Sequence, residues 1–208
     1  MSGTEALAVL SAIATVISIV DGIKKLYDAA SDAKGLPSAF REVVNRLPLV
    51  HETLQTANKE VDAGGLNEAT CKAMKKVVEA CGTKAENLEI IFKKVLPEAD
   101  SSRMDRYLKA LKSLPKGSRV ELLMKGILED VQILTSNHGM KTVTKDELEK
   151  LTEAIEEMEK LPPSADDDSA GKSQSAIHHG QGDLYAAMEN QYTAKDQSHL
   201  YHATNMTF

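Results

Sequence analysis

The chain has 208 residues, a formal net charge of −6 and only 4% aromatic residues, with no Trp. A composition this poor in aromatic residues favours packed helices over a β-sandwich. Residues 1–161 carry 23 Lys/Arg against 25 Asp/Glu, whereas residues 162–208 carry 2 against 6. The first part therefore lacks the broadly basic surface typical of nucleic-acid-binding domains, and we expect no nucleic-acid partner.

The first predicted helix runs from about Thr4 to Ala33 and contains the most apolar stretch of the chain. Its residues 6–20 include no charged side chain. As a helix this stretch is about 22 Å long, against about 30 Å for the hydrocarbon core of a bilayer. The length therefore favours a central bundle helix that is buried all round, and a helix that enters a membrane is the alternative. A cleaved signal sequence is disfavoured because Glu5, and no Lys or Arg, precedes the run.

The second predicted helix begins after Pro37, and the third covers about Asn67 to Leu96. Both carry apolar residues at alternating steps of three and four, which is the period of helices packed in a bundle. Pro48 lies within the second stripe and predicts a kink. The third stripe is the most regular, and its members are Met74, Val78, Cys81, Ala85, Leu88, Phe92 and Val95.

Three shorter helices are predicted in the rest of the first 161 residues. One spans about 102–113, and the next starts after Ser118 and continues to about 137. The last begins at a capping box formed by Thr144 and Glu147, and it ends before Pro162-Pro163. No segment here alternates with the period of a strand. We therefore expect residues 1–161 to form an all-α domain, a multi-helix bundle of five to six helices with a four-helix-bundle-like core.

The composition changes after residue 161. Residues 162–175 are rich in Pro, Ser and Asp and have little to bury, which predicts a disordered linker. Residues 176–208 are predicted to be a low-order tail, whose polar residues and spaced tyrosines suit stacking with other copies in cross-β form. The residues expected to carry that assembly are Tyr185, Gln191, Tyr192 and Tyr201.

Residues 103–125 concentrate positive charge in an otherwise acidic chain. Such a cluster could contact anionic lipid headgroups or a partner. The other interpretation, which we favour, is a solvated helix face whose cations pair with acidic residues elsewhere, such as those at 153–159. The candidate contact residues are Arg103, Arg106, Lys109, Lys112, Lys116 and Arg119.

No arrangement of side chains predicts catalysis, a cofactor or a metal site, and we do not expect an enzyme. Gly171-Lys172-Ser173 resembles the end of a phosphate-binding loop, but the motif requires a glycine where Asp166 stands. Cys71 and Cys81 would be about 15 Å apart on one helix, too far for a disulfide. Histidines are frequent in the tail, but no carboxylate or thiol is arranged to complete a metal site with them. They are His178, His179, His199 and His202.

Three blocks of the sequence resemble a known family. They are MSGTEALAVLSAIATVISIVDGIKKLYDAA, GLPSAFREVVNRLPLVHETL and SRMDRYLKALKSLPKGSRVELLMKGILEDVQIL. These blocks are similar to the SesA-type, HeLo-like N-terminal domain of fungal NACHT and P-loop NTPases, and the similarity covers roughly residues 1–161. The resemblance implies a helical bundle that acts in regulated cell death, in fungal innate immunity and heterokaryon incompatibility. Because the chain leaves no room for a NACHT module, we expect the stand-alone form with a C-terminal amyloid motif.

The resemblance also implies a mechanism. The amyloid motif of a NOD-like receptor would template the tail, and the chain would then oligomerise. The N-terminal helix would move from a cytoplasmic bundle at rest to the anionic lipids of the plasma membrane on activation. The alternative is a soluble helical adaptor of a NOD-like receptor pathway that has no membrane activity. In the first case the membrane-active residues would be Leu7, Leu10, Ile13, Val16, Ile17 and Val20.

Overall fold

A computed structural model describes residues 3–30, 35–64, 66–97, 101–137 and 144–166, together with 186–188 and 191–193. The chain divides into two compact units, Met1–Gly171 and Lys172–Phe208. The described residues of the first unit form six helices, which confirms the predicted all-α bundle. They are α1 (Gly3–Ala29), α2 (Ser38–Asp62), α3 (Glu68–Val95), α4 (Arg103–Lys112), α5 (Val120–Asn137) and α6 (Lys145–Lys160).

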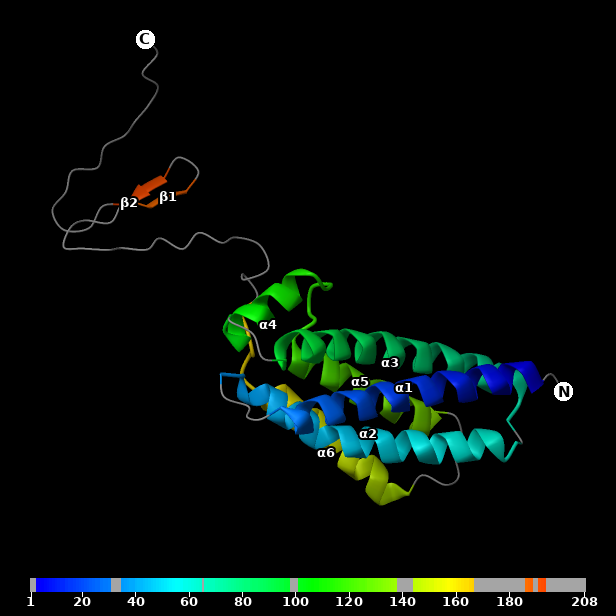
Figure 1. Cartoon of the computed structure of the whole chain (residues 1–208). Coiled ribbons are helices and arrows are strands. Elements are labelled where there is room, and N and C mark those ends of the chain that lie inside the picture. Colours follow the sequence, from blue (N-terminus) through cyan, green and yellow to red (C-terminus); the bar gives the residue numbers. More distant parts are fainter. Residues whose placement is uncertain are drawn as a thin grey trace, which may run out of the picture. The chain divides into compact units, whose positions relative to one another are not determined.

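Four of these helices form the core of the first unit (Figure 1). Helix α1 packs on α2 and α3, and α5 packs on the same two helices, so α1 and α5 occupy opposite corners of a four-helix arrangement. Helix α4 packs on α3, and α6 packs chiefly on α5. The predicted four-helix-bundle-like core is thus present, with α4 and α6 added to its outside.

The helix ends follow local capping rules. The Asn67 side chain accepts a hydrogen bond from the Thr70 amide at 2.8 Å at the start of α3. The predicted capping box of Thr144 and Glu147 is present at the start of α6. Helix α1 ends at Ala29, earlier than the expected Ala33, where the Ala30 amide donates to the Tyr27 carbonyl at 3.1 Å. Such an i→i−3 bond tightens and closes a last turn.

Three aromatic side chains lie at the centre of the core and are shielded from solvent. The Phe40 ring lies 5.1 Å from the Phe92 ring and 5.1 Å from the Tyr107 ring, measured between centroids. Tyr27 of α1 reaches the same cluster, with its centroid 6.3 Å from that of Phe92. Spacings of this size are typical of favourable aromatic pairs. The cluster therefore ties α1, α2, α3 and α4 together.

The segment after α6 differs from its prediction as part of a disordered linker. Ser164 and Ala165 are 6% and 5% exposed, so the packed structure continues past residue 161. The composition of 162–175 gave no sign of this, because the burial rests on hydrogen bonds and not on large apolar side chains. Residues 167–175 lie outside the described residues.

The second unit contains one described element, an antiparallel pair of strands. Strand β1 (Ala186–Met188) pairs with β2 (Gln191–Thr193), and Ala187 is opposite Tyr192. The predicted assembly residues Gln191 and Tyr192 thus belong to a strand. Tyr185 and Tyr201 lie outside the described residues, as do the four tail histidines.

Candidate functional site

Only one stripe of α1 is buried. Its members recur at steps of four and three and are at most 2% exposed, and they face α2 and α3. The expectation of a central helix buried all round was therefore wrong. The run is free of charge, but small residues such as Ser11, Ala14 and Ser18 occupy its outer face and tolerate water. The buried residues are Val9, Ile13, Val16, Val20 and Ile23.

The six predicted membrane-active residues divide between the two faces. Ile13, Val16 and Val20 belong to the buried stripe. Leu10 and Ile17 are partly buried against the core, and Leu7 is 65% exposed. Three of the six side chains are therefore buried in the bundle, and the other three are at least partly exposed.

By length and composition, the segment Thr4–Ala29 is able to cross a membrane. Buried core helices and N-terminal signal sequences pass the same test, and 28% of the most apolar window of this segment is buried in the bundle. The uncovered face of the run is free of charge, but it includes the hydroxyl side chains of Ser11, Thr15 and Ser18. In the bundle, protein covers α1 on one side.

A polar contact ties the second half of α1 to α2. Asp21 Oδ1 lies 2.7 Å from His51 Nδ1, and His51 Nε2 lies 2.6 Å from Gln55 Nε2. A pocket of about 230 Å³ opens beside this contact, with Leu47 and Pro48 in its lining. The joint between α1 and α2 thus includes an open, polar contact at Asp21, between the buried Val20 and Ile23.

Two of the predicted lipid-contact residues hold the bundle together. Arg106 donates to the carbonyls of Val95 at 2.7 Å and Pro97 at 2.8 Å, and it also donates to the Ser101 carbonyl. It therefore satisfies carbonyl groups at the end of α3, a common role for Arg at a helix C-terminus. Arg119 donates to the Ala165 carbonyl at 3.2 Å.

The remaining predicted contact residues lie nearer the surface. Lys109, Lys112 and Lys116 are exposed, while Arg103 is half-buried. The acids of α6 that were expected to neutralise the cluster mainly pair elsewhere. Lys125 Nζ lies 2.5 Å from Glu159 Oε1, and Arg46 of α2 binds Glu157. The pairing prediction therefore holds for Lys125, at the end of the basic stretch, and Arg119 also pairs with an acidic residue, Glu121. Three lysines on and after α4 are exposed.

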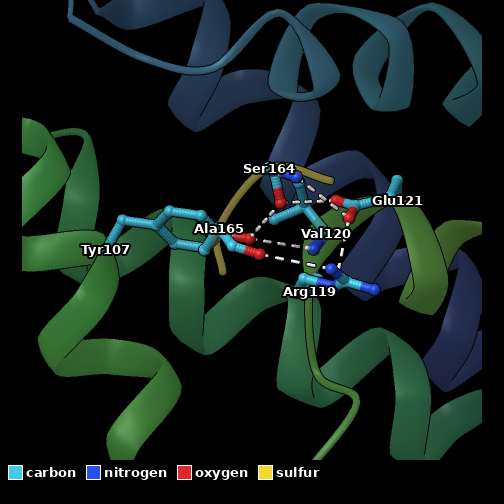
Figure 2. A network of polar contacts seen from close by, with 6 residues as sticks. All are labelled: Tyr107, Arg119, Val120, Glu121, Ser164 and Ala165. Carbon is cyan, nitrogen blue, oxygen red and sulfur yellow. Dashed lines mark hydrogen bonds and ion pairs between the residues drawn. The ribbon is translucent and has the colours of Figure 1, made fainter. Parts of the chain in front are cut away.

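A buried polar cluster, which sequence reasoning missed, joins the segment after α6 to the start of α5 (Figure 2). The Ser164 amide donates to Glu121 Oε1 at 3.1 Å, and the Ser164 hydroxyl donates to Glu121 Oε2 at 2.5 Å. The Tyr107 hydroxyl lies 2.6 Å from Ser164 Oγ and accepts from the Val120 amide at 3.2 Å. Glu121 is also paired with Arg119, Nε to Oε1 at 3.3 Å. No pattern in the sequence marks these residues, because their spacing along the chain reaches 57 positions.

A second ion pair links α3 to α5. Lys84 Nζ lies 2.6 Å from Asp130 Oδ2. Burial raises the pKa of the Asp130 carboxyl, and the bond from Lys84 opposes that rise. Gly126 makes room for the pair, since a Cβ at that position would lie 2.8 Å from Lys84 Cδ and Cε. Nearby Cys81 is a free, buried thiol, as the spacing of the cysteines predicted.

We expect Cys81 to react very slowly with iodoacetamide in the folded chain. Burial, reinforced by the charge of Asp130, raises the pKa of its thiol to about 12. At pH 8 its thiolate fraction would be about three orders of magnitude below that of an ordinary cysteine, and the thiolate is the reacting form. Peptide mass spectrometry after timed alkylation measures the rate. A Cys81 rate equal in folded and urea-unfolded protein would contradict this arrangement.

Among the residues that the structure describes, no group of three or more His, Cys, Asp or Glu side chains is placed to hold a metal ion.

Comparison with known protein families places the bundle in one of them. Residues 13–134, from α1 to α5, match the model of the SesA family, described as an N-terminal domain on NACHT_NTPase and P-loop NTPases. No curated protein and no solved structure matches the chain.

Proposed function

The chain belongs to the SesA family, a signalling-type N-terminal domain of NACHT and P-loop NTPases, and on this premise we propose that it is a membrane-targeting effector of regulated cell death. At rest, the buried stripe of α1 packs on α2 and α3. On activation, α1 leaves the bundle and enters a membrane. The observation that supports this most directly is that residues 6–20 of α1 carry no charge on any face, while protein covers the helix on one side.

The free energies involved allow α1 to exchange burial in the bundle for burial in a bilayer. Burial of an aliphatic side chain is worth about 1.5–3 kcal/mol, so release of the five-residue stripe costs on the order of 10 kcal/mol. A bilayer restores that burial and also covers surface that the bundle leaves open, including Leu7. A ligand or a lipid shifts a conformational equilibrium by its differential affinity for the two states. Lipid contact with both faces of α1 supplies that difference.

The ends of the apolar run set limits on insertion. The charge-free residues 6–20 span about 22 Å as a helix, so Glu5 and Asp21 would lie at the two headgroup layers of a locally thinned bilayer. Insertion requires Asp21 to leave His51, to which it is bonded at rest. Lys24 pairs with Asp28 within α1, Nζ to Oδ2 at 2.8 Å, and both stay outside the hydrocarbon.

Assembly of the tail is the proposed trigger. When a receptor's amyloid motif templates residues 176–208, the attached bundles are held together at high effective concentration. The exposed Lys109, Lys112 and Lys116 then contribute electrostatic attraction to anionic headgroups, worth about 1 kcal/mol each close to the surface. In this proposal the chain is cytoplasmic at rest and moves to the plasma membrane on activation.

Dye leakage from liposomes that contain phosphatidylserine tests the proposal. We expect full-length protein, seeded with fibres of a 176–208 peptide, to release the dye. A variant without residues 1–20 and a variant without residues 176–208 should not. Equal leakage by the seeded full-length chain and the variant without residues 1–20 would refute a membrane role for α1. A protein that stays in the soluble fraction of dying cells would instead support the adaptor function.

A further inference from the structure

The residues that follow α6 are bound to the bundle in the manner of a docked peptide. Ser164 contributes both its amide and its hydroxyl to the Glu121 carboxylate, and the neighbouring Ala165 carbonyl accepts from Arg119. Tyr107 of α4 completes the contact through the Ser164 hydroxyl. Side chains from α4 and from the start of α5 thus converge on two consecutive residues (Figure 2).

Opening the cluster costs free energy because its polar groups are buried. Glu121 is 3% exposed and Tyr107 is fully buried. If Ser164 leaves, the carboxylate loses two donors while it remains in a largely water-free site. A buried charged group without its hydrogen bonds is destabilising by more than the bonds themselves contribute. The docked segment therefore opposes any rearrangement of α4 and the start of α5.

The location of the cluster gives it a mechanical role. Ser164 and Ala165 are the last buried residues that the structure describes on the way to residues 176–208, and they bind Glu121 and Arg119 directly. Tension that reaches these two residues along the chain therefore acts on the start of α5. Helix α5 packs on α2 and α3, which are the two helices that cover the stripe of α1. If the start of α5 moves, the packing of α2 and α3 changes directly, and these are the helices that bury the stripe of α1.

We propose that Ser164 and Ala165 form a latch, which keeps the bundle closed while it is docked on Tyr107, Arg119 and Glu121 and loosens α4 and α5 when the C-terminal region pulls it away. This device rests on the proposed function only in its last step, the release of α1. The opening of the bundle itself is measured without a membrane. Cys81, buried on α3 beside Asp130 of α5, reports that opening.

The substitution Ser164→Asp tests the latch in the full-length chain. It places a second negative charge against Glu121, where like charges repel in a poorly solvated site. We expect Cys81 alkylation to accelerate by about tenfold or more, the change expected when a buried hydrogen bond to a charged group is lost. Hydrogen exchange of the α4 and α5 amides should increase in parallel. Ser38→Asp, which adds the same charge at an exposed position at the start of α2, should leave both rates unchanged.

A second substitution shows whether repulsion between residues 164 and 121 causes the faster alkylation of Cys81. Glu121→Gln removes the repulsion, so the Ser164→Asp/Glu121→Gln pair should react more slowly than Ser164→Asp alone. If Ser164→Asp fails to fold, Ser164→Ala replaces it, with an expected increase of a few-fold from the lost hydroxyl bonds. Unchanged alkylation and exchange in the variant that folds would overturn the latch. Faster alkylation without leakage from liposomes would support the latch and reject the membrane function.

Discussion

Replacing Ala14 with Asp should abolish membrane insertion by α1 and leave the bundle folded. Ala14 is exposed on the outer face of α1, near the midpoint of the charge-free run. In the bundle the new carboxylate faces water. In a bilayer it would lie near the centre, where an acidic residue costs about 2.5–3.5 kcal/mol on insertion scales. That cost lowers the inserted population by about two orders of magnitude.

A matched control separates insertion from helix stability. Ala80→Asp makes the same substitution at an exposed position of α3, and Asp disfavours a helix interior equally at both sites. Liposome flotation and dye leakage of the tail-seeded proteins provide the measurement, with thermal unfolding as the check on folding. We expect Ala80→Asp to behave as the wild type. If Ala14→Asp and Ala80→Asp bind and leak alike, α1 does not enter the bilayer.

Replacing Phe92 with Ala should destabilise the bundle by about 3–5 kcal/mol, the range measured for Phe to Ala in protein cores. Phe92 is fully buried on α3. Its ring contacts Phe40 of α2 and Tyr27 of α1, so truncation leaves a cavity where three helices meet. Urea unfolding followed by circular dichroism measures the change in free energy. Such a loss is a large fraction of the stability of an ordinary domain.

Ile90→Ala is the control for the Phe92 variant. Ile90 lies on the same helix but is 37% exposed, and substitutions at such positions usually change stability far less than core truncations. We expect it to shift the free energy of unfolding by about 1 kcal/mol or less. A Phe92→Ala variant no less stable than Ile90→Ala would show that the aromatic cluster does not join α1, α2 and α3 as described. If Phe92→Ala remains folded, it should also release α1 more readily, because Tyr27 loses its main aromatic neighbour.

The helices and their ends were predictable because local interactions determine them. The steps of three and four in 67–96 predicted α3, and Pro37 and Pro97 predicted where neighbouring segments change direction. The capping box of Thr144 and Glu147 depends on residues three positions apart, so the sequence alone contains all of its parts. The resemblance over three sequence blocks likewise predicted the family that the match over residues 13–134 shows.

The surroundings of each helix face were decided by tertiary structure. A hydrophobic period identifies residues that share a face, but it does not tell what covers that face. The sequence therefore predicted that α1 is apolar, and only the packing showed that one stripe, with Ile13 and Val16, is covered. The partner of a charged side chain is undetermined for the same reason. Arg106 looked like a surface cation, yet it binds the carbonyls at the end of α3.

The sequence by itself determined an all-α bundle, the positions of its helices and an unusually apolar first helix, because each depends on residues close together in the chain. Tertiary structure decided which face of α1 is open and which cations remain at the surface. It also decided that Ser164 docks on Glu121, 43 positions away. Contacts at such separation depend on how the helices are arranged in space, and hydrogen bonds between single polar residues leave no periodic signal in the sequence.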